Sequence, residues 1–172
     1  MNRKRGCGLM TGLMIAAFYA VPLIAQGARG KAELKAAGGS ITIDYGRPSS
    51  PGRDRVEELR AGDVWRMGKD QSATFTTPVS LSFGAVKIPK GSYSIWLKRV
   101  AADKFELVFN SQTGKWGTDH DPSKDIASVP LKKESLPSLV ETFTIELKPA
   151  QNGGTFEMMW GKTKLSAPFS FN

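Results

Sequence analysis

Apolar and polar residues alternate along most of the chain after residue 40, and this period of two is the strongest constraint on the fold. Successive side chains of an extended strand point to opposite faces, so such a run buries one face and exposes the other. The pattern predicts strands in the segments 41–45, 79–83, 93–97, 105–109, 142–147, 156–160 and 165–171.

Turn-forming residues separate these runs. Glycine and proline interrupt the pattern at Gly84, Pro89-Lys90-Gly91, Asn152-Gly153-Gly154 and Gly161. Only residues 53–60 have helical spacing, and that segment is too short to be stable alone. Short strands with one apolar face predict an all-β fold: an antiparallel β-sandwich or a flattened jelly-roll-like barrel with one short helix.

The first 27 residues are typical of a signal peptide. Basic residues at 3–5 precede an apolar stretch from Leu9 to Ile24, which at about 16 residues is shorter than the roughly 20 that span a membrane. We expect cleavage near residues 25–27, no transmembrane span after it, and a periplasmic or secreted product. Cys7 is the single cysteine, so the mature chain would lack disulfides.

The remaining chain is long enough for one domain. We expect residues 28–39 to be a flexible leader and residues 40–172 to form a single β-sandwich domain. The full chain carries a net charge of +8, and loss of the three basic residues at 3–5 leaves +5. No Lys/Arg block with interleaved aromatics occurs, so we expect no nucleic-acid binding. The excess of positive charge suits anionic ligands or an anionic cell envelope.

Two turn-rich segments carry the main candidate residues. Arginine forks pair with carboxylates, so Asp44 with Arg47 or Arg66 is either an internal salt bridge or part of an anion site. Tyr45 or Trp65 would then supply an aromatic platform beside that site.

Trp65 and Arg66 are consecutive, so in an extended segment they point to opposite faces. We expect Trp65 to pack into the end of the sandwich. Arg66 would reach Asp44 or a ligand carboxylate beside Arg47. Trp116 and His120, on a neighbouring loop, complete the candidate ligand-binding set.

His120 is the only histidine. Zinc and copper sites need several imidazoles or thiolates, so we expect no metal and no cofactor. Residues 119–125 begin like a calcium loop, but Lys124 stands where such a loop needs glycine, and Pro130 where it needs glutamate. We expect Asp121 instead to cap a short helical turn with Pro122 at its first position.

Several stretches occur in a characteristic order: "ITIDYGRPSSPGR" (41–53), "GDVWRMGKDQSATFT" (62–76), "VKIPKGSYSIWL" (86–97), "FNSQTGKWG" (109–117), "HDPSKD" (120–125) and "VETFTIEL" (140–147). Over residues 35–172 the chain resembles the bacterial domain-of-unknown-function 2911 (DUF2911) family of small exported proteins. The resemblance implies a β-rich exported domain and no established activity. Met67 stands where a small polar residue is common, and Lys69-Asp70-Gln71 replaces a more usual Ala-Asn-Glu.

Three functional hypotheses follow. The favoured one is a non-enzymatic binding module for a small polar ligand, a glycan or an envelope partner. The alternative is a metal-independent hydrolase or isomerase acting on an envelope carbohydrate, with His120 and Asp121 or Asp44 as its working groups. A third is a purely structural envelope protein. The first two predict that Arg47, Arg66 and His120 point into one concavity, and the third that they are dispersed or paired.

Overall fold

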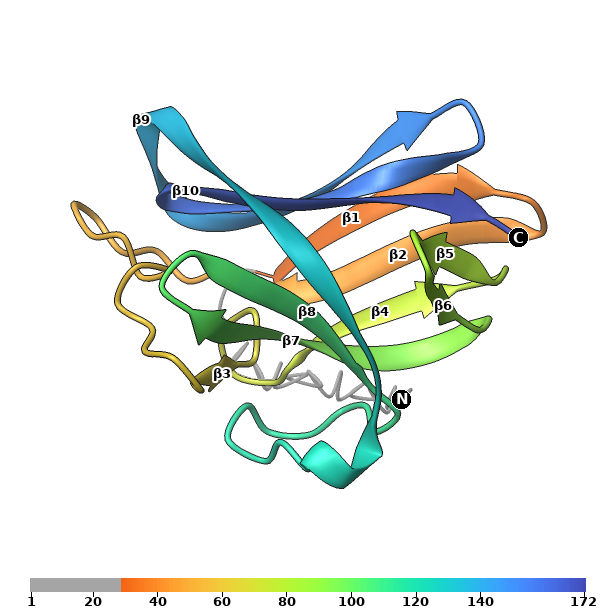
Figure 1. Ribbon diagram of the computed structural model, residues 1–172, viewed down its shortest axis with the longest axis horizontal. Helices are drawn as coiled ribbons and strands as arrows, with labels where there is room; N and C mark the ends of the chain where they lie inside the picture. Colours follow the sequence, from red (N-terminus) through yellow and green to blue (C-terminus); the bar gives the residue numbers. More distant parts are fainter. Residues whose placement is uncertain (1–28) are drawn as a thin grey trace, which may run out of the picture.

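The alternating segments form strands of one antiparallel sheet that folds over on itself into two packed layers (Figure 1). The computed structural model describes residues 29–172, so the expectations about residues 1–27, including Cys7 and the cleavage site, lie outside the described residues. The elements are β1 (Arg29–Ala36), β2 (Gly39–Gly46), β3 (Val64–Trp65), β4 (Ala73–Thr77), β5 (Leu81–Phe83), β6 (Val86–Ile88), β7 (Gly91–Ala101), β8 (Lys104–Asn110), the 3-10 helix η1 (Pro122–Lys124), β9 (Asp125–Ala150) and β10 (Gly153–Phe171).

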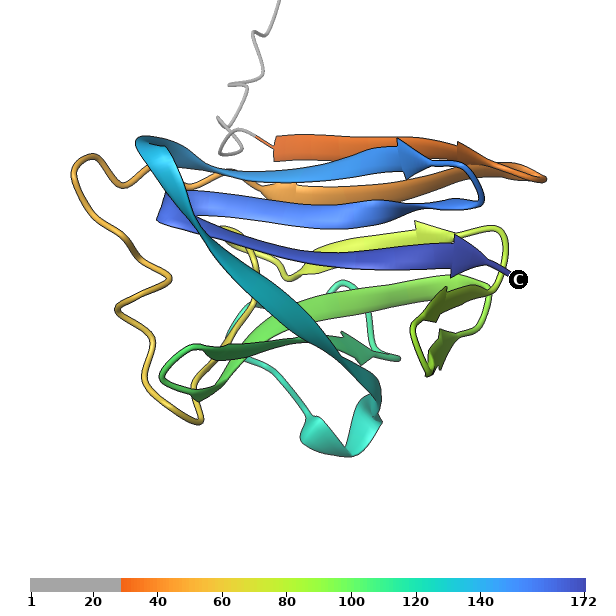
Figure 2. The same ribbon diagram turned by 45° about the horizontal axis from the view of Figure 1, so that its top comes forward.

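The strands follow the order β1–β2–β4–β7–β8–β9–β10–β5–β6, with β3 paired to β7 beside this path. Strand β9 belongs to both layers: its first residues, up to Leu131, pair with β8, and most of the rest pairs with β10. Figure 2 shows β9 crossing from one layer to the other. Over residues 29–172 the path ends at β1 and β6, so the sheet is sandwich-like and does not close into a barrel.

The expected alternation places one face of each layer in a shared core. Ile43, Phe75 and Ile95 of the first layer are fully buried, as are Phe143 and Phe156 of the second. Phe109 of β8 lies among other aromatic rings, with centroids 5.3 Å from Phe75, 5.8 Å from Phe83 and 6.1 Å from Tyr93. The all-β prediction is therefore confirmed, with one shared core between the two layers.

The prediction of a flexible leader is wrong for its described part. Residues Arg29–Ala36 form strand β1, paired in continuous register with β2. Ala32 and Leu34 are the inward residues, and both are buried. An alanine buries little apolar surface, so this strand carries a weak hydrophobic signal although it occupies a full edge of the sheet.

Two predicted local features also differ. Residues 53–60 form turns and no helix: the Asp54 carboxylate accepts hydrogen bonds from the backbone of Val56 and Glu57, as a helix cap does, but the helical turn does not continue. Gly161 is no turn between strands: β10 runs through it, and its φ of 66° marks a bulge in the pairing with β9.

No helix among residues 29–172 is long and apolar enough to cross a membrane.

The aromatic packing around Phe109 gives the first prediction. Phe109→Ala should lower the free energy of unfolding by about 3–5 kcal/mol, because truncation of a buried phenylalanine removes apolar burial and leaves a cavity. Val100→Ala, at a β7 residue that is 42 % exposed, is the control and should change stability by less than about 0.5 kcal/mol. Urea unfolding curves measure both, and similar small losses would contradict the assignment of Phe109 to the core.

Candidate functional site

The segments that carry the Asp-Tyr-x-Arg-Pro and Trp-Arg-x-Gly motifs pack backbone against backbone. A Cβ on Gly46 would lie 2.6 Å from the Lys69 nitrogen, and one on Gly68 would lie 3.0 Å from the Gly46 nitrogen. Met67 and Asp70 have positive φ values of 52° and 67°. Such a conformation costs non-glycine residues about 1–3 kcal/mol and persists only where the surroundings enforce it. The two motifs therefore form one interlocked unit.

Tyr45 and Arg47 tie the first layer to β9. The Tyr45 hydroxyl accepts a hydrogen bond from the Ile145 nitrogen at 2.9 Å and lies 3.3 Å from the Ile145 oxygen, to which it donates. Arg47 donates through Nε to the Phe143 oxygen (3.4 Å) and through Nη2 to the Thr144 hydroxyl (3.3 Å). At Ile145 β9 pairs only with β10, so the Tyr45 hydroxyl supplies partners that a neighbouring strand would otherwise give, beside the hydrogen bond from the Phe143 nitrogen to the Pro48 oxygen at 2.9 Å.

Asp44 does not pair with Arg47 or Arg66, and that prediction is wrong. Its carboxylate accepts a hydrogen bond from Nε of Arg29 at 2.6 Å on the exposed face of the β1–β2 hairpin. The reason is the strand itself: Ile43 and Tyr45 point into the core, so Asp44 between them points into solvent.

Trp65 packs into the end of the sandwich, as expected. It is half-buried, its ring stacks on buried Trp160 with a centroid separation of 5.2 Å and an interplanar angle of 27°, and Phe143 lies 4.8 Å away in an edge-to-face arrangement. Trp160 is fixed in turn by donation from Nε1 to the Glu141 oxygen at 3.0 Å.

The Arg66 side chain points in a different direction from the one predicted. Its Nε donates to the Gly68 oxygen at 3.2 Å, and its side chain lies against Gly117, where any Cβ would overlap it. The expectation that it reaches Asp44 is wrong. Arg66 instead supports the loop that carries Trp116.

His120 has a packing role on the outer face of the sheet. Its side chain is 14 % exposed and its ring lies 4.8 Å from that of buried Trp96. Its Nε2 lies 2.9 Å from the Asp125 carboxylate, which also accepts a hydrogen bond from Asn110. Asp121 caps η1 as predicted: its carboxylate accepts hydrogen bonds from the Ser123 hydroxyl at 2.7 Å and from the Ser123 nitrogen at 3.0 Å, and these bonds, the first more than the second, lower the pKa of Asp121.

Trp116 is 53 % exposed, and its backbone forms a bridge with Gln71. Arg47, Arg66 and His120 therefore do not converge in one concavity: Arg47 lies at the β9 edge, Arg66 beneath Gly117, and His120 on Trp96. Each of the three has a structural partner, and this dispersed arrangement is the one that the purely structural hypothesis predicted for these residues.

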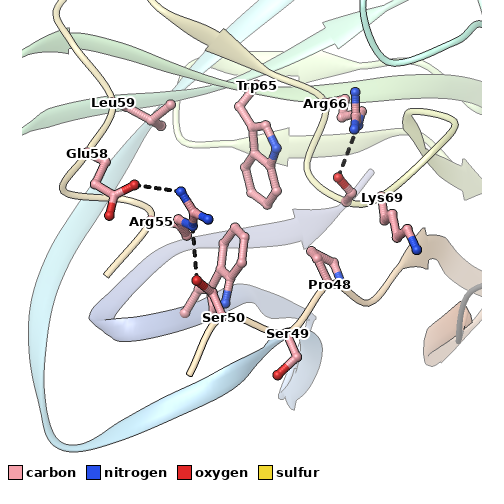
Figure 3. Close-up of a pocket in the computed structure, with 11 residues that line it drawn as sticks. Pro48, Ser49, Ser50, Arg55, Glu58, Leu59, Trp65, Arg66 and Lys69 are labelled. Atoms are coloured by element: carbon pink, nitrogen blue, oxygen red, sulfur yellow. Dashed lines mark hydrogen bonds and ion pairs between the residues drawn. The ribbon is translucent and has the colours of Figure 1, made fainter. Parts of the chain in front are cut away.

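A cavity of about 360 Å³ opens beside the stacked tryptophans, and we call it the tryptophan pocket. Figure 3 shows Trp65 reaching into it, with Arg55 and Ser50 across from the indole and Lys69 beside Pro48. Its lining residues are Pro48, Ser49, Ser50, Arg55, Glu58, Leu59, Trp65, Arg66, Gly68, Lys69 and Trp160.

One wall of the tryptophan pocket is a fixed ion-pair network. Glu58 accepts two hydrogen bonds from Arg53, at 2.8 and 2.9 Å, and one from Arg55 at 2.9 Å. The hydrogen bond from Arg53, followed by that from Arg55 and the charges of both, lowers the pKa of Glu58 even though its burial acts in the opposite direction. Arg55 also donates to Ser50 at 2.9 Å, so its guanidinium is held across the pocket from Trp65 (Figure 3).

A second hollow, of about 400 Å³, lies between β1 and β9 and is lined by Tyr45, Arg47 and the charged residues Lys31, Glu33, Glu146 and Lys148. No group of three or more His, Cys, Asp or Glu residues is placed to hold a metal ion within residues 29–172.

A family model described as a protein of unknown function, DUF2911, matches residues 28–169. The chain belongs to the DUF2911 family. Searches of curated proteins and of solved structures found no match.

In this DUF2911 protein the sequence motifs identify the region of the tryptophan pocket but not its composition. Trp65 and Arg66 were expected there, whereas Trp160, Arg55 and Lys69 were missed. Trp160 looks like any inward residue of an alternating strand, and Arg55 belongs to a segment that was expected to be helical. Their convergence depends on contacts between segments about 100 residues apart in the chain, which no local pattern encodes.

The Tyr45 bridge gives the second prediction. Tyr45→Phe should lower the free energy of unfolding by about 1–3 kcal/mol, because a buried backbone nitrogen and oxygen of Ile145 lose their partner. Tyr93→Phe is the matched control: its hydroxyl donates to the Pro89 oxygen in an exposed position, where water can replace it. Thermal and urea unfolding measure both, and equal effects would argue against the bridge.

Proposed function

We propose that this protein is a binding module that takes a small polar ligand in the tryptophan pocket. The observation that carries the proposal is the half-buried Trp65, stacked on Trp160 at the wall of a cavity of about 360 Å³. A volume of this size lies within the range of small-molecule sites, which combine apolar walls with a few placed polar groups.

The frame of the pocket supports the same proposal. Ligand sites gain affinity when their groups are held in place before binding. Arg55 is fixed by Ser50 and Glu58, and Trp160 by the Glu141 oxygen. The neighbouring positive φ angles of Met67 and Asp70 are the kind of backbone strain that clusters at binding sites. His120 does not line this pocket, so the pocket does not support a hydrolase or isomerase that works through His120.

We also propose that the protein is exported and works in the periplasm or outside the cell. The support is the short apolar stretch after basic residues in the first 27 positions.

A ligand panel gives the third prediction. Neutral sugars, sugar acids and small organic acids are screened by thermal shift, and a ligand present at 100 times its Kd should stabilise the protein by about 2.7 kcal/mol. Trp65→Leu should abolish this shift because it removes the pocket wall. Trp116→Leu, at an exposed tryptophan outside the pocket, should retain it. If the shift were lost in Trp116→Leu and kept in Trp65→Leu, the ligand would bind outside the tryptophan pocket. A complete panel without any shift would favour the purely structural hypothesis.

Export gives the fourth prediction. Intact-mass measurement of the full chain, expressed in a bacterium and recovered from the periplasm or medium, should give a mass that corresponds to cleavage near residues 25–27. Replacing apolar residues of the stretch 9–24 by charged ones should retain the uncleaved protein in the cytoplasm. A protein recovered with Met1 and residues 2–27 intact would contradict the proposal.

A further inference from the structure

The tryptophan pocket is electrically asymmetric. Three of its lining residues are cationic and one is acidic. On one side, the single acid, Glu58, is shared between Arg55 and its neighbour Arg53, so this wall already contains a bound carboxylate. On the other side, neither Arg66 nor Lys69 forms a salt bridge with any acid of the described chain.

The two cations that form no salt bridge within residues 29–172 come from one short segment. Arg66 uses Nε for the Gly68 oxygen, and Lys69 is exposed beside Pro48 (Figure 3). The backbone of this segment is fixed by its close approach to Gly46, so the two charges remain near the pocket even though the Lys69 side chain is exposed. Positive charge without a partner at the border of a cavity attracts anions, and low-dielectric walls strengthen the attraction.

Apart from Ser49 and Ser50, the other side chains that line the pocket are apolar. Leu59 and Pro48 join Trp65 and Trp160 around the cavity. A ligand that bound here through charge alone would leave these side chains in contact with water. A ring or short carbon skeleton would cover them and gain the corresponding burial of apolar area.

We propose that the ligand of the tryptophan pocket is a small organic anion with a ring-sized body. Its acidic group lies on the side of Lys69 and Arg66, and its body lies against Trp65 and Leu59. This assignment rests on the proposed function of the pocket as a binding site and specifies the chemistry of what it binds. The net positive charge of the chain favours the same class of ligand.

The test uses three pairs of an acid and its neutral counterpart, each measured by isothermal titration calorimetry: glucuronate and glucose, benzoate and benzyl alcohol, and phenyl phosphate and phenol. Inorganic phosphate is the probe for charge without a body. In at least one pair the acid should bind about tenfold or more tightly than the neutral compound, and more tightly than inorganic phosphate. Its affinity should fall as salt rises, because salt screens an exposed charge.

Two variants locate the charge. Lys69→Gln should weaken binding of the acid by about threefold to tenfold and reduce its salt dependence, and should leave the neutral partner unchanged. Lys87→Gln, at an exposed lysine on β6 outside the pocket, should change neither. Equal weakening by both variants would show a general effect of net charge and overturn the assignment.

The remaining outcomes separate this inference from the proposed function. Neutral compounds that bind as tightly as their acids, with binding lost in Trp65→Leu, would overturn the anion assignment and leave the pocket as a binding site. Inorganic phosphate binding as tightly as the organic acids would remove the role of the apolar walls. Failure of all seven compounds to bind would overturn the anion assignment, and the broader ligand panel with Trp65→Leu would then decide whether the pocket binds anything.

Discussion

The hydrogen bonds between Tyr45 and Ile145 hold together a sheet that folds over without closing. At Ile145 β9 pairs only with β10, and a single hydroxyl provides both an acceptor and a donor for the buried backbone groups of that residue. Arg47 likewise donates hydrogen bonds to the Phe143 oxygen and the Thr144 hydroxyl. Gly30 is required above them, because a Cβ there would lie 2.6 Å from the Tyr45 ring. Side chains thus complete an edge that strand pairing leaves open.

The tryptophan pocket depends on a second set of contacts at the end of the sandwich. Residues 48–60 run around that end as a long connection (Figure 1). Asp54 fastens this connection to β10: its carboxylate accepts hydrogen bonds from the Lys162 nitrogen at 2.8 Å and the Thr163 hydroxyl at 3.1 Å. Arg99 holds the other end by donating to the Glu57 and Leu59 oxygens. Leu59 and Glu58 therefore face Trp65 because polar contacts fix the chain around them.

The conspicuous residues of the sequence fall into two groups: those that contact other parts of the fold, and those on which the proposed binding site rests. Asp44, Tyr45, Arg47 and His120 all have partners within the described chain, and their chemistry serves the fold. Trp65 and Lys69 differ: Trp65 keeps part of its ring in contact with a cavity, and Lys69 forms no salt bridge within residues 29–172. A ligand could bind the ring surface of Trp65 and the charge of Lys69 because neither is fully used in contacts within the fold, and the proposals therefore rest on these two residues.

The sequence by itself determined the secondary structure of most of the chain, since alternation of side chains is a local property of strands. The runs around Ile43, Phe109 and Ile145 illustrate this, and so does the cap of η1 by Asp121, which needs only neighbours two residues away. The local pattern predicts secondary structure less well where tertiary packing determines it. Strand β1 was not predicted because Ala32 buries little apolar surface, and residues 53–60 have helical spacing but form turns.

Only the tertiary structure decided which side chains meet. Trp65 and Trp160 lie in strands from different layers, and their stacking requires β3, β10 and the bulge at Gly161 to be in place. Asp44 points toward Arg29 because its place in β2 fixes the face on which its side chain lies, and Arg66, which follows the short strand β3, lies against Gly117 of a distant loop. Short-range sterics determine which face of a strand each side chain occupies, and this can be read from the sequence. A pocket forms where segments far apart in the chain come together, and the shared core determines how those segments meet.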